Sequence, residues 1–279
     1  MGLFTEMKAL KAMRVHGKGD IERAKELYQQ ALDKGCMSAR PMLSYALLML
    51  REGKYQPCMD LLVRLQKAPD LTPERKSQLF IYYAACCAKT GDLEKGVSLL
   101  ERQHNRAPTG LTYQTMGYLY TELYDQDRKP VADENTVIRQ HMENLEPGDE
   151  APIVEGLSVE EKQARLDADW AEGKEKAMKL LEESIDYDDE DAVCMDNMAQ
   201  FYYRVLGDKA TAKTWFDKAH EEKPGQIDSL WFLSRYDLEA GDTAAAIEKL
   251  ETAMRGNFSP LNFADRAMVE AELKRLKGN

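Results

Sequence analysis

The chain has 279 residues, more than one average domain, and 43% of them are apolar, which is enough for a core and excludes wholesale disorder. Its 38 basic and 49 acidic residues give a net charge of −11, which argues against broad electrostatic binding to nucleic acid or anionic lipid. No apolar run approaches the roughly 18 residues of a membrane helix, and no signal-peptide pattern opens the chain, so we expect a cytoplasmic protein without membrane contact.

Two helix–turn–helix units are expected at the start of the chain. The first covers about residues 3–34 and turns at Gly19-Asp20; the second begins near Ala39 and turns at Gly53-Lys54. The two turn glycines, Gly19 and Gly53, indicate a regular spacing between the units. A helical stripe of small and aromatic side chains marks the second helix of the first unit: Ala24, Tyr28 and Ala31.

A third unit follows after a slightly long linker. Residues 67–74 contain Pro69 and Pro73, which interrupt helices. The next turn is expected at Gly91-Asp92, and Pro108 ends the second helix of this unit. The chain up to Pro108 therefore predicts three consecutive helix pairs.

The regular spacing fails in the fourth unit. Met116, Gly117 and Tyr120 fit a first helix and a turn is due near residue 124, but a second-helix pattern begins only at Ala177. Residues 125–170 between them hold thirteen acidic and five basic residues, so their charge of −8 is most of the chain's −11. We interpret them as an acidic insertion within the fourth unit.

Two helices are expected inside the insertion. One is short and lies around residues 134–145. The other starts at Ser158, because Glu161 three residues later completes a capping box, and it can run on into the Ala177 helix. An alternative makes residues 131–172 a degenerate extra repeat, although Glu161, Arg165 and Glu172 fall at or beside positions that should be apolar or small.

The clearest unit covers residues 195–224, with its turn at Gly207-Asp208, and a sixth unit turns at Gly241-Asp242, so that Gly207 and Gly241 repeat the spacing of Gly19 and Gly53. In the fifth unit, small Ala199 and Ala212 allow two helix backbones to approach closely. Residues 260–279 predict one last charged amphipathic helix, which suits the cap that an open array of repeats requires.

These motifs together resemble the tetratricopeptide repeat (TPR) of bacterial proteins. Ala212 and Phe216 form the A-x3-F stripe of a second helix, Pro224 ends that helix, and the turn glycines recur at a period of about 34 residues. The resemblance covers nearly all of the chain outside the insertion and the last helix. It implies an all-α, right-handed TPR superhelix, an α-solenoid of about six helix–turn–helix repeats over residues 1–279, with a C-terminal capping helix.

The resemblance also implies a binding groove, because the first helix of each repeat lines the concave face of TPR proteins. The positions that match here are Leu43, Leu47, Tyr82, Tyr118, Asn197, Gln200, Tyr203, Trp231 and Arg235. An apolar half beside an aromatic and polar half suits an amphipathic helix or an extended peptide with apolar anchors. The expected function is a non-enzymatic scaffold that binds a protein or peptide.

Other TPR functions fit the sequence less well or stay open. Domains that clamp acidic chaperone tails use lysine, asparagine and arginine at five positions, which here hold Ala9, Met13, Ser44, Gln78 and Tyr82. The groove could instead be filled by tight curvature or by the insertion folding back. A regulatory receptor for a small peptide or metabolite, with residues 125–157 as a lid, is a further alternative, and homo-oligomers are also possible.

No pattern predicts catalytic residues, a cofactor or a metal. The four histidines lack ligand spacing and are expected on the surface or at helix ends: His16, His104, His141 and His220. An enzyme with its site in the insertion would have only His141 available there. The acidic run at residues 186–191 lacks the glycine and the final glutamate of a calcium loop, and we expect it to favour the start of the next helix.

The five cysteines lie inside helical patterns: Cys36, Cys58, Cys86, Cys87 and Cys194. Adjacent Cys86 and Cys87 would point about 100° apart on a helix, which is a poor arrangement for a disulfide. We expect reduced thiols that act as small buried hydrophobes in a reducing cytoplasm.

Overall fold

The computed structural model describes residues 2–140 and 151–278, which are mostly helical. The first six helices pack as three consecutive pairs. The pairs are α1 (Gly2–His16) with α2 (Ile21–Asp33), α3 (Ala39–Arg51) with α4 (Tyr55–Leu65), and α5 (Pro73–Thr90) with α6 (Leu93–His104). The three units predicted for the chain up to Pro108 are confirmed.

Three more pairs follow. They are α7 (Gly110–Leu123) with α8 (Val159–Tyr187), α9 (Ala192–Gln200) and its π-helical continuation η2 (Phe201–Leu206) with α10 (Lys209–Glu222), and α11 (Ile227–Glu239) with α12 (Thr243–Met254). A last helix, α13 (Arg266–Lys277), packs on α12. None of the helices in residues 2–140 and 151–278 combines the length and the apolar character that crossing a membrane requires.

The turns have the geometry that the sequence predicts. Five turn glycines have a positive φ: Gly19, Gly53, Gly91, Gly207 and Gly241. Glycine adopts this left-handed conformation without the steric penalty that a Cβ brings, so it ends one helix and lets the chain reverse. The aspartate after three of them caps the next helix: the carboxylates of Asp20, Asp208 and Asp242 each accept a hydrogen bond from a backbone N–H of the first helical turn.

Small residues allow the helices to pack closely, as expected. Ala199 and Ala212 are fully buried in one cluster with Phe216. All five cysteines are free and buried, in agreement with the prediction. Burial raises the pKa of the Cys87 thiol to about 11 and that of Cys194 to about 12, so both stay protonated near neutral pH.

The insertion differs from the expectation in part. Residues 134–140 are not helical, so the short helix expected around 134–145 is wrong there, and residues 141–145 lie outside the described part of the chain. Instead, a short 3₁₀ turn, η1 (Gln126–Arg128), is followed by irregular chain, and one antiparallel bridge joins Arg139 to Ile153. The pairing of a few backbone groups replaces the predicted helix.

The helix predicted from Ser158 is confirmed. The Ser158 hydroxyl accepts a hydrogen bond from the backbone N–H of Glu161, whose carboxylate accepts one from the backbone N–H of Ser158. Helix α8 then continues to Tyr187, so residues 159–170 of the expected insertion form its N-terminal extension. A degenerate repeat over residues 131–172 would need a helix pair there. Residues 131–140 and 151–158 are not helical, and residues 159–172 belong to α8, so the described residues of this stretch form one helix and not a pair.

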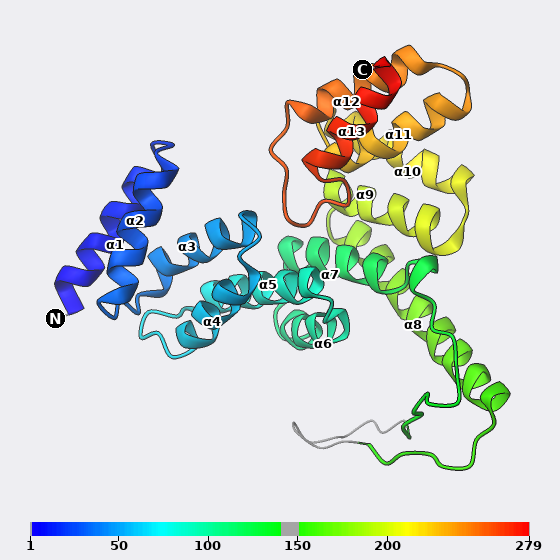
Figure 1. Ribbon diagram of the computed structural model, residues 1–279, viewed down its shortest axis with the longest axis horizontal. Helices are drawn as coiled ribbons and strands as arrows, with labels where there is room; N and C mark the ends of the chain where they lie inside the picture. Colours follow the sequence, from blue (N-terminus) through cyan, green and yellow to red (C-terminus); the bar gives the residue numbers. More distant parts are fainter. Residues whose placement is uncertain (1, 141–150, 279) are drawn as a thin grey trace.

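The helix pairs follow one another along an arc (Figure 1). Helices α1 and α2 lie at one end, and α11 to α13 lie at the other. The connection between α12 and α13, residues 255–265, turns toward the inside of the arc. The described part of the insertion projects with the N-terminal end of α8, away from that connection (Figure 1).

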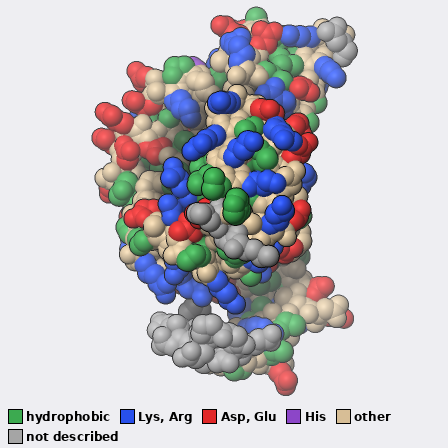
Figure 2. Space-filling model, turned by 90° about the vertical axis from the view of Figure 1, so that its left-hand side faces the viewer, with side chains coloured by type: hydrophobic (Ala, Val, Ile, Leu, Met, Phe, Trp, Pro, Cys, Tyr) green, Lys and Arg blue, Asp and Glu red, His purple; other side chains and the backbone are tan. Residues whose placement is uncertain are grey.

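Charge is distributed unevenly along the arc. Residues 1–90 hold fifteen basic and nine acidic residues, a net charge of +6, so the remaining residues carry −17. Figure 2 shows many Lys and Arg side chains at the end of the molecule where α1 and α2 lie. The net charge of −11 therefore describes the later repeats and not this end, which is positively charged.

A candidate binding groove inside the arc

A cavity of about 520 Å³ lies on the inside of the arc. Its walls come from the first helices of the second to sixth pairs, α3, α5, α7, α9 and α11. Residues 223–226, which connect α10 to α11, and residues 257–262 of the α12–α13 connection complete them. We call this cavity the groove. Its volume falls in the range of about 300–1,000 Å³ that is typical of ligand sites in proteins.

Four of the nine residues predicted to line a groove do so: Leu47, Tyr82, Tyr118 and Asn197. The hydroxyl of Tyr82 accepts a hydrogen bond from Gln78 Nε2 at 2.7 Å, which fixes its ring against α5. Leu43 is instead buried in the cluster that α1 to α5 share, and it does not reach the groove.

The other four predicted residues are engaged elsewhere. Gln200 is buried between hydrogen bonds to Asp196 and Arg204. Tyr203 packs among aromatic rings, with its centroid 5.0 Å from that of Phe232. Two further side chains are held together and against α13: Arg235 lies 4.3 Å from the ring of Trp231 and forms an ion pair of 2.6 Å with Glu272.

The reason for this difference is the path of the chain after α12. TPR positions predict an inner face that is open, but here α13 and the α12–α13 connection fold onto the inner face of the last repeats. The guanidinium of Arg204 lies 4.3 Å from the ring of Phe263, and Leu261 packs against the buried clusters of both α1–α5 and α5–η2. The groove is thus partly filled by residues 257–264.

The described insertion does not contribute to this filling. None of the described residues within 125–157 lines the cavity, so this part of the chain does not fold back into it. The insertion contacts η2 at its start, where Asp125 accepts a hydrogen bond from Arg204 Nε. Farther along it contacts α8: the Gln163 carboxamide oxygen accepts a hydrogen bond from the backbone N–H of Ala132, and Lys162 Nζ donates to the carbonyl of Glu134.

One wall of the groove is apolar. It includes Leu47 and Leu50 from α3, Ile81 from α5 and Leu111 from α7. Leu111 is 61% exposed. Leu50 and Ile81 are only 3% and 7% exposed, so Leu111 is the most exposed of the four side chains of this wall.

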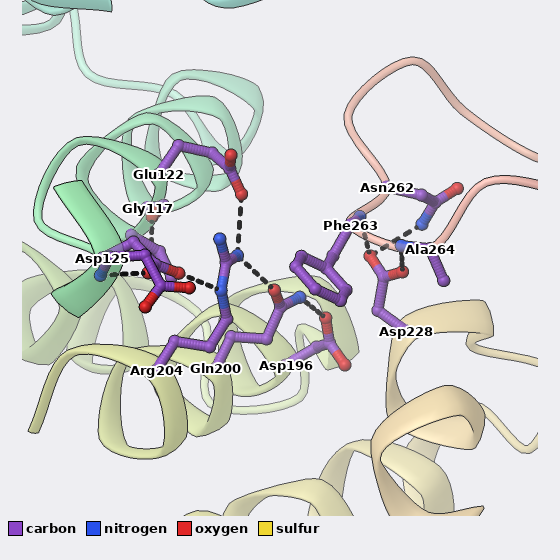
Figure 3. A network of polar contacts seen from close by, with 12 residues as sticks. Gly117, Glu122, Asp125, Asp196, Gln200, Arg204, Asp228, Asn262, Phe263 and Ala264 are labelled. Atoms are coloured by element: carbon purple, nitrogen blue, oxygen red, sulfur yellow. Dashed lines mark hydrogen bonds and ion pairs between the residues drawn. The ribbon is translucent and has the colours of Figure 1, made fainter. Parts of the chain in front are cut away.

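The opposite wall contains two buried aspartates that the sequence analysis did not single out (Figure 3). Asp196 on α9 accepts hydrogen bonds from Ser229 Oγ at 2.5 Å and Gln200 Nε2 at 2.8 Å. Burial, with a smaller effect of the Asp228 carboxylate, raises the pKa of Asp196 to about 7. In sequence Asp196 is one of three polar residues of α9, beside Asn197 and Gln200, and no pattern separates it from them.

Asp228 on α11 holds the α12–α13 connection in place (Figure 3). Its carboxylate accepts hydrogen bonds from Asn262 Nδ2 at 2.9 Å and from the backbone N–H groups of Phe263 and Ala264 at 3.0 Å. Burial raises the pKa of Asp228 as well. Because its partners follow it by 34 to 36 residues, no local sequence pattern reveals this role.

Arg204 in η2 connects this wall to the fourth repeat (Figure 3). Its Nε forms an ion pair of 2.8 Å with Asp125, and its Nη1 forms one of 2.7 Å with Glu122. The same Nη1 donates to the Gln200 side-chain oxygen at 3.2 Å, and Gln200 in turn donates to Asp196. Arg204 is therefore occupied by the two acids of α7 and its C-terminal turn.

The remaining candidates for chemistry have structural roles. His104 ends α6 but is buried, with Nδ1 2.9 Å from Thr112 Oγ1, and burial lowers its pKa. Asp191 of the acidic run caps α9 by accepting from Val193 and Cys194 N–H, as expected. His141 lies outside the described residues. In residues 2–140 and 151–278, no three His, Cys, Asp or Glu side chains are grouped so that they could hold a metal ion.

Comparison with known proteins shows the fold. No protein-family model and no curated protein sequence matches the chain. The thermophilic TPR protein TTC0263 of Thermus thermophilus is 14% identical, with 87% of this chain and 100% of that chain covered and a TM-score of 0.58. A TPR protein from Parabacteroides merdae ATCC 43184 is 14% identical over 100% of each chain, with a TM-score of 0.47, and MamA protein is 13% identical over 81% and 95%, with 0.49.

At this level of identity a structural match establishes the fold and not the function. The match to the Thermus protein agrees with the six consecutive helix pairs and with the turn glycines that separate the helices of five of them. The chain therefore has the tetratricopeptide-repeat fold, an α-solenoid of helix–turn–helix repeats.

Proposed function

We propose that the chain is a non-enzymatic scaffold that binds a segment of a partner protein, or a peptide, in its groove. The observation that carries this proposal is the composition of the groove walls, because five successive repeats contribute to a single cavity. A segment lying there would contact each repeat in turn, and the apolar wall of α3, α5 and α7 would receive its apolar side chains. The five free, buried thiols support a reducing compartment such as the cytoplasm.

The proposal can be tested with charge introduced at the apolar wall. Leu47→Glu and Leu111→Glu each place a carboxylate in the groove, and the exposure of Leu111 means that the fold should tolerate the change. Val63→Glu is a matched control, since Val63 is 51% exposed on α4 and does not line the groove. Circular dichroism and the melting temperature should be similar for the three variants and the original chain.

The binding measurement uses the full chain and a random peptide library displayed on phage. We expect selected peptides to bind the original chain and Val63→Glu equally, and to bind both groove variants at least about ten-fold more weakly. If no peptide is selected, or if the selected peptides bind all four proteins alike, the groove does not bind peptides and the proposal fails.

A further inference from the structure

The two aspartates of the groove are buried, and neither forms an ion pair within the described residues. Asp196 and Asp228 are each 2% exposed, and in the part of the chain that the structure describes their carboxylates contact only neutral donors. Burying a carboxylate is costly unless a cation or several strong hydrogen bonds compensate it. Both residues line the groove, so a ligand could supply the missing positive charge.

Two further groups in the groove lack partners. Tyr118 and Gln226 are 5% and 6% exposed and line the groove, yet no hydrogen bond within the described residues involves the Tyr118 hydroxyl or the Gln226 carboxamide. Buried polar atoms that are both unpartnered and sealed from solvent belong, among described residues, to Tyr28, Ser77 and His220. The polar atoms of Tyr118 and Gln226 are therefore open to the cavity, where a ligand can reach them.

The nearby cations act on the aspartates only from a distance, since Arg204 lowers the pKa of Asp228 and Lys223 lowers that of Asp196 without an ion pair to either aspartate among the described residues. Arg204 is paired with Glu122 and Asp125. Lys89 lies 5.4 Å over the Tyr118 ring and does not line the groove. The groove's one lysine among its described lining residues, Lys223, is exposed at the rim, so the charged side chains of the wall are two buried acids against one solvated cation. This balance favours a cationic ligand over an anionic one.

The geometry points to an ammonium group on an alkyl stem. The apolar wall of α3, α5 and α7 can pack along methylenes, and the rings of Tyr82 and Tyr118 in the same cavity favour a cation near their faces. Each aspartate oxygen already accepts at least one hydrogen bond, so neither carboxylate is free for the bidentate contact that a guanidinium prefers. A compact ammonium can donate to several acceptors separately.

We propose that the groove selects a lysine side chain of the bound segment, whose stem lies on the apolar wall and whose ammonium group binds at Asp196, Asp228 and the Tyr118 hydroxyl. This inference rests on the proposed function, because it names the side chain that such a groove would recognise. It predicts that partner segments carry a lysine next to apolar residues.

The first test uses n-hexylamine, which is protonated near neutral pH, and the uncharged n-hexanol as probes of the full chain in NMR titrations. We expect hexylamine to bind at least about ten-fold more tightly than hexanol. Asp196→Asn should remove most of that difference, while Asp217→Asn, an exposed acid outside the groove, should leave it unchanged. Equal binding of the two probes, or no effect of Asp196→Asn, would overturn the proposal.

A second variant keeps the proposal testable if the Asp196→Asn protein does not fold. Tyr118→Phe removes a hydroxyl that has no partner among the described residues, so the melting temperature should hold, and hexylamine affinity should fall by about three- to ten-fold. If a folded Tyr118→Phe protein binds hexylamine with unchanged affinity, the Tyr118 hydroxyl does not contact the ammonium group. This result would count against the proposal in the same way as an unaffected Asp196→Asn.

The peptides selected from the library separate this inference from the function on which it rests. Lysine in each selected peptide is replaced by norleucine and, separately, by arginine. We expect norleucine to weaken binding at least about ten-fold and arginine to weaken it less. Groove-dependent peptides that contain no lysine would leave the scaffold function intact and overturn the lysine site. If hexylamine binds but no groove-dependent peptide is found, the ligand is a free amine. That result would overturn the proposal that the groove binds a peptide segment.

Discussion

Arg204 shows how much of this fold depends on one side chain that the repeat pattern does not specify. It is 9% exposed and forms ion pairs with Glu122 and Asp125 while its guanidinium packs on Phe263. Three segments that are distant in sequence thus meet at one guanidinium. Removing it would leave two largely buried carboxylates without their cation.

We expect Arg204→Met to lower the free energy of unfolding by about 3 kcal/mol, which is typical when one partner of a buried ion pair is removed. Urea denaturation followed by circular dichroism measures this change. Lys213→Met is the control, because its ion pair with Asp217 is exposed and such pairs contribute less than about 1 kcal/mol. Similar losses in both variants would contradict a special role for Arg204.

Asp196 makes stability depend on pH. Its pKa of about 7 in the folded chain lies above the unfolded value near 3.9, so the folded chain favours the protonated carboxyl. The stability that this preference contributes is complete below about pH 4 and is lost as the pH rises through about 7. The charged groups that act on it are Asp228, which raises its pKa, and Lys223, which lowers it. We therefore expect the melting temperature to fall more between about pH 5 and pH 8 in the original chain than in Asp196→Asn.

Two comparisons isolate the effect of Asp196 in this measurement. His104 contributes the opposite slope, because burial lowers its pKa, and this slope cancels when the two proteins are compared. Asp217→Asn should keep the pH dependence of the original chain. Identical pH profiles for the original chain and Asp196→Asn would show that the aspartate stays ionised over this range.

At the scale of the elements, Gly173 allows α8 to pass close to Tyr124. A Cβ at this position would collide with the ring and hydroxyl of Tyr124, which also makes an edge-to-face contact of 5.1 Å with Trp170. Glycine inside a helix normally costs about 1 kcal/mol relative to alanine. Its presence here is explained by the tyrosine that crosses the helix.

Gly173→Ala should therefore destabilise the chain by about 1–3 kcal/mol, against the usual helix preference, because the added methyl group displaces Tyr124. Thermal denaturation of the single and double variants tests the reason. In a Tyr124→Ala background the same Gly173→Ala change should be neutral or stabilising. Destabilisation of the same size in both backgrounds would mean that the contact with Tyr124 is not the cause.

The sequence predicted the positions of the helices better than it predicted the contacts between helices that are distant in the chain. The turn glycines and the Ser158–Glu161 capping box are local signals, and local hydrogen bonds realise them. The π-helical segment η2 was not predicted, because a helix with one wider turn has nearly the same apolar pattern as an ordinary one. The path of the α12–α13 connection was missed for another reason: repeat patterns encode contacts between adjacent helices, whereas Asp228 binds residues that lie beyond the next helix.

The candidate site was predicted in part for the same reason. Leu47, Tyr82, Tyr118 and Asn197 occupy positions whose inward direction depends only on their own helix. Trp231 and Arg235 occupy equivalent positions, but α13 covers them through Glu272. Their local pattern does not contain that information.

At the scale of the whole molecule, Leu261 links the end of the array to the buried clusters of earlier repeats. It packs against the buried cluster of α1–α5 and against that of α5–η2. We expect Leu261→Ser to lower stability by about 1–2 kcal/mol and to increase the radius of gyration measured by small-angle X-ray scattering, since the arc would open. Leu206→Ser, at an exposed leucine, should change neither property much. An unchanged radius in a folded Leu261→Ser protein would show that the arc keeps its shape without this contact.

The contact of Leu261 also has a consequence for how this chain can evolve. An open solenoid can gain or lose a repeat by duplication or deletion, because each repeat contacts only its neighbours. Here residues 257–264 return across the arc to helices of the early repeats, so one more helix pair between them would carry Leu261 away from its place. The span across the arc fixes the number of repeats. Changes of length are expected instead where the arc is unaffected, as in the insertion between α7 and α8.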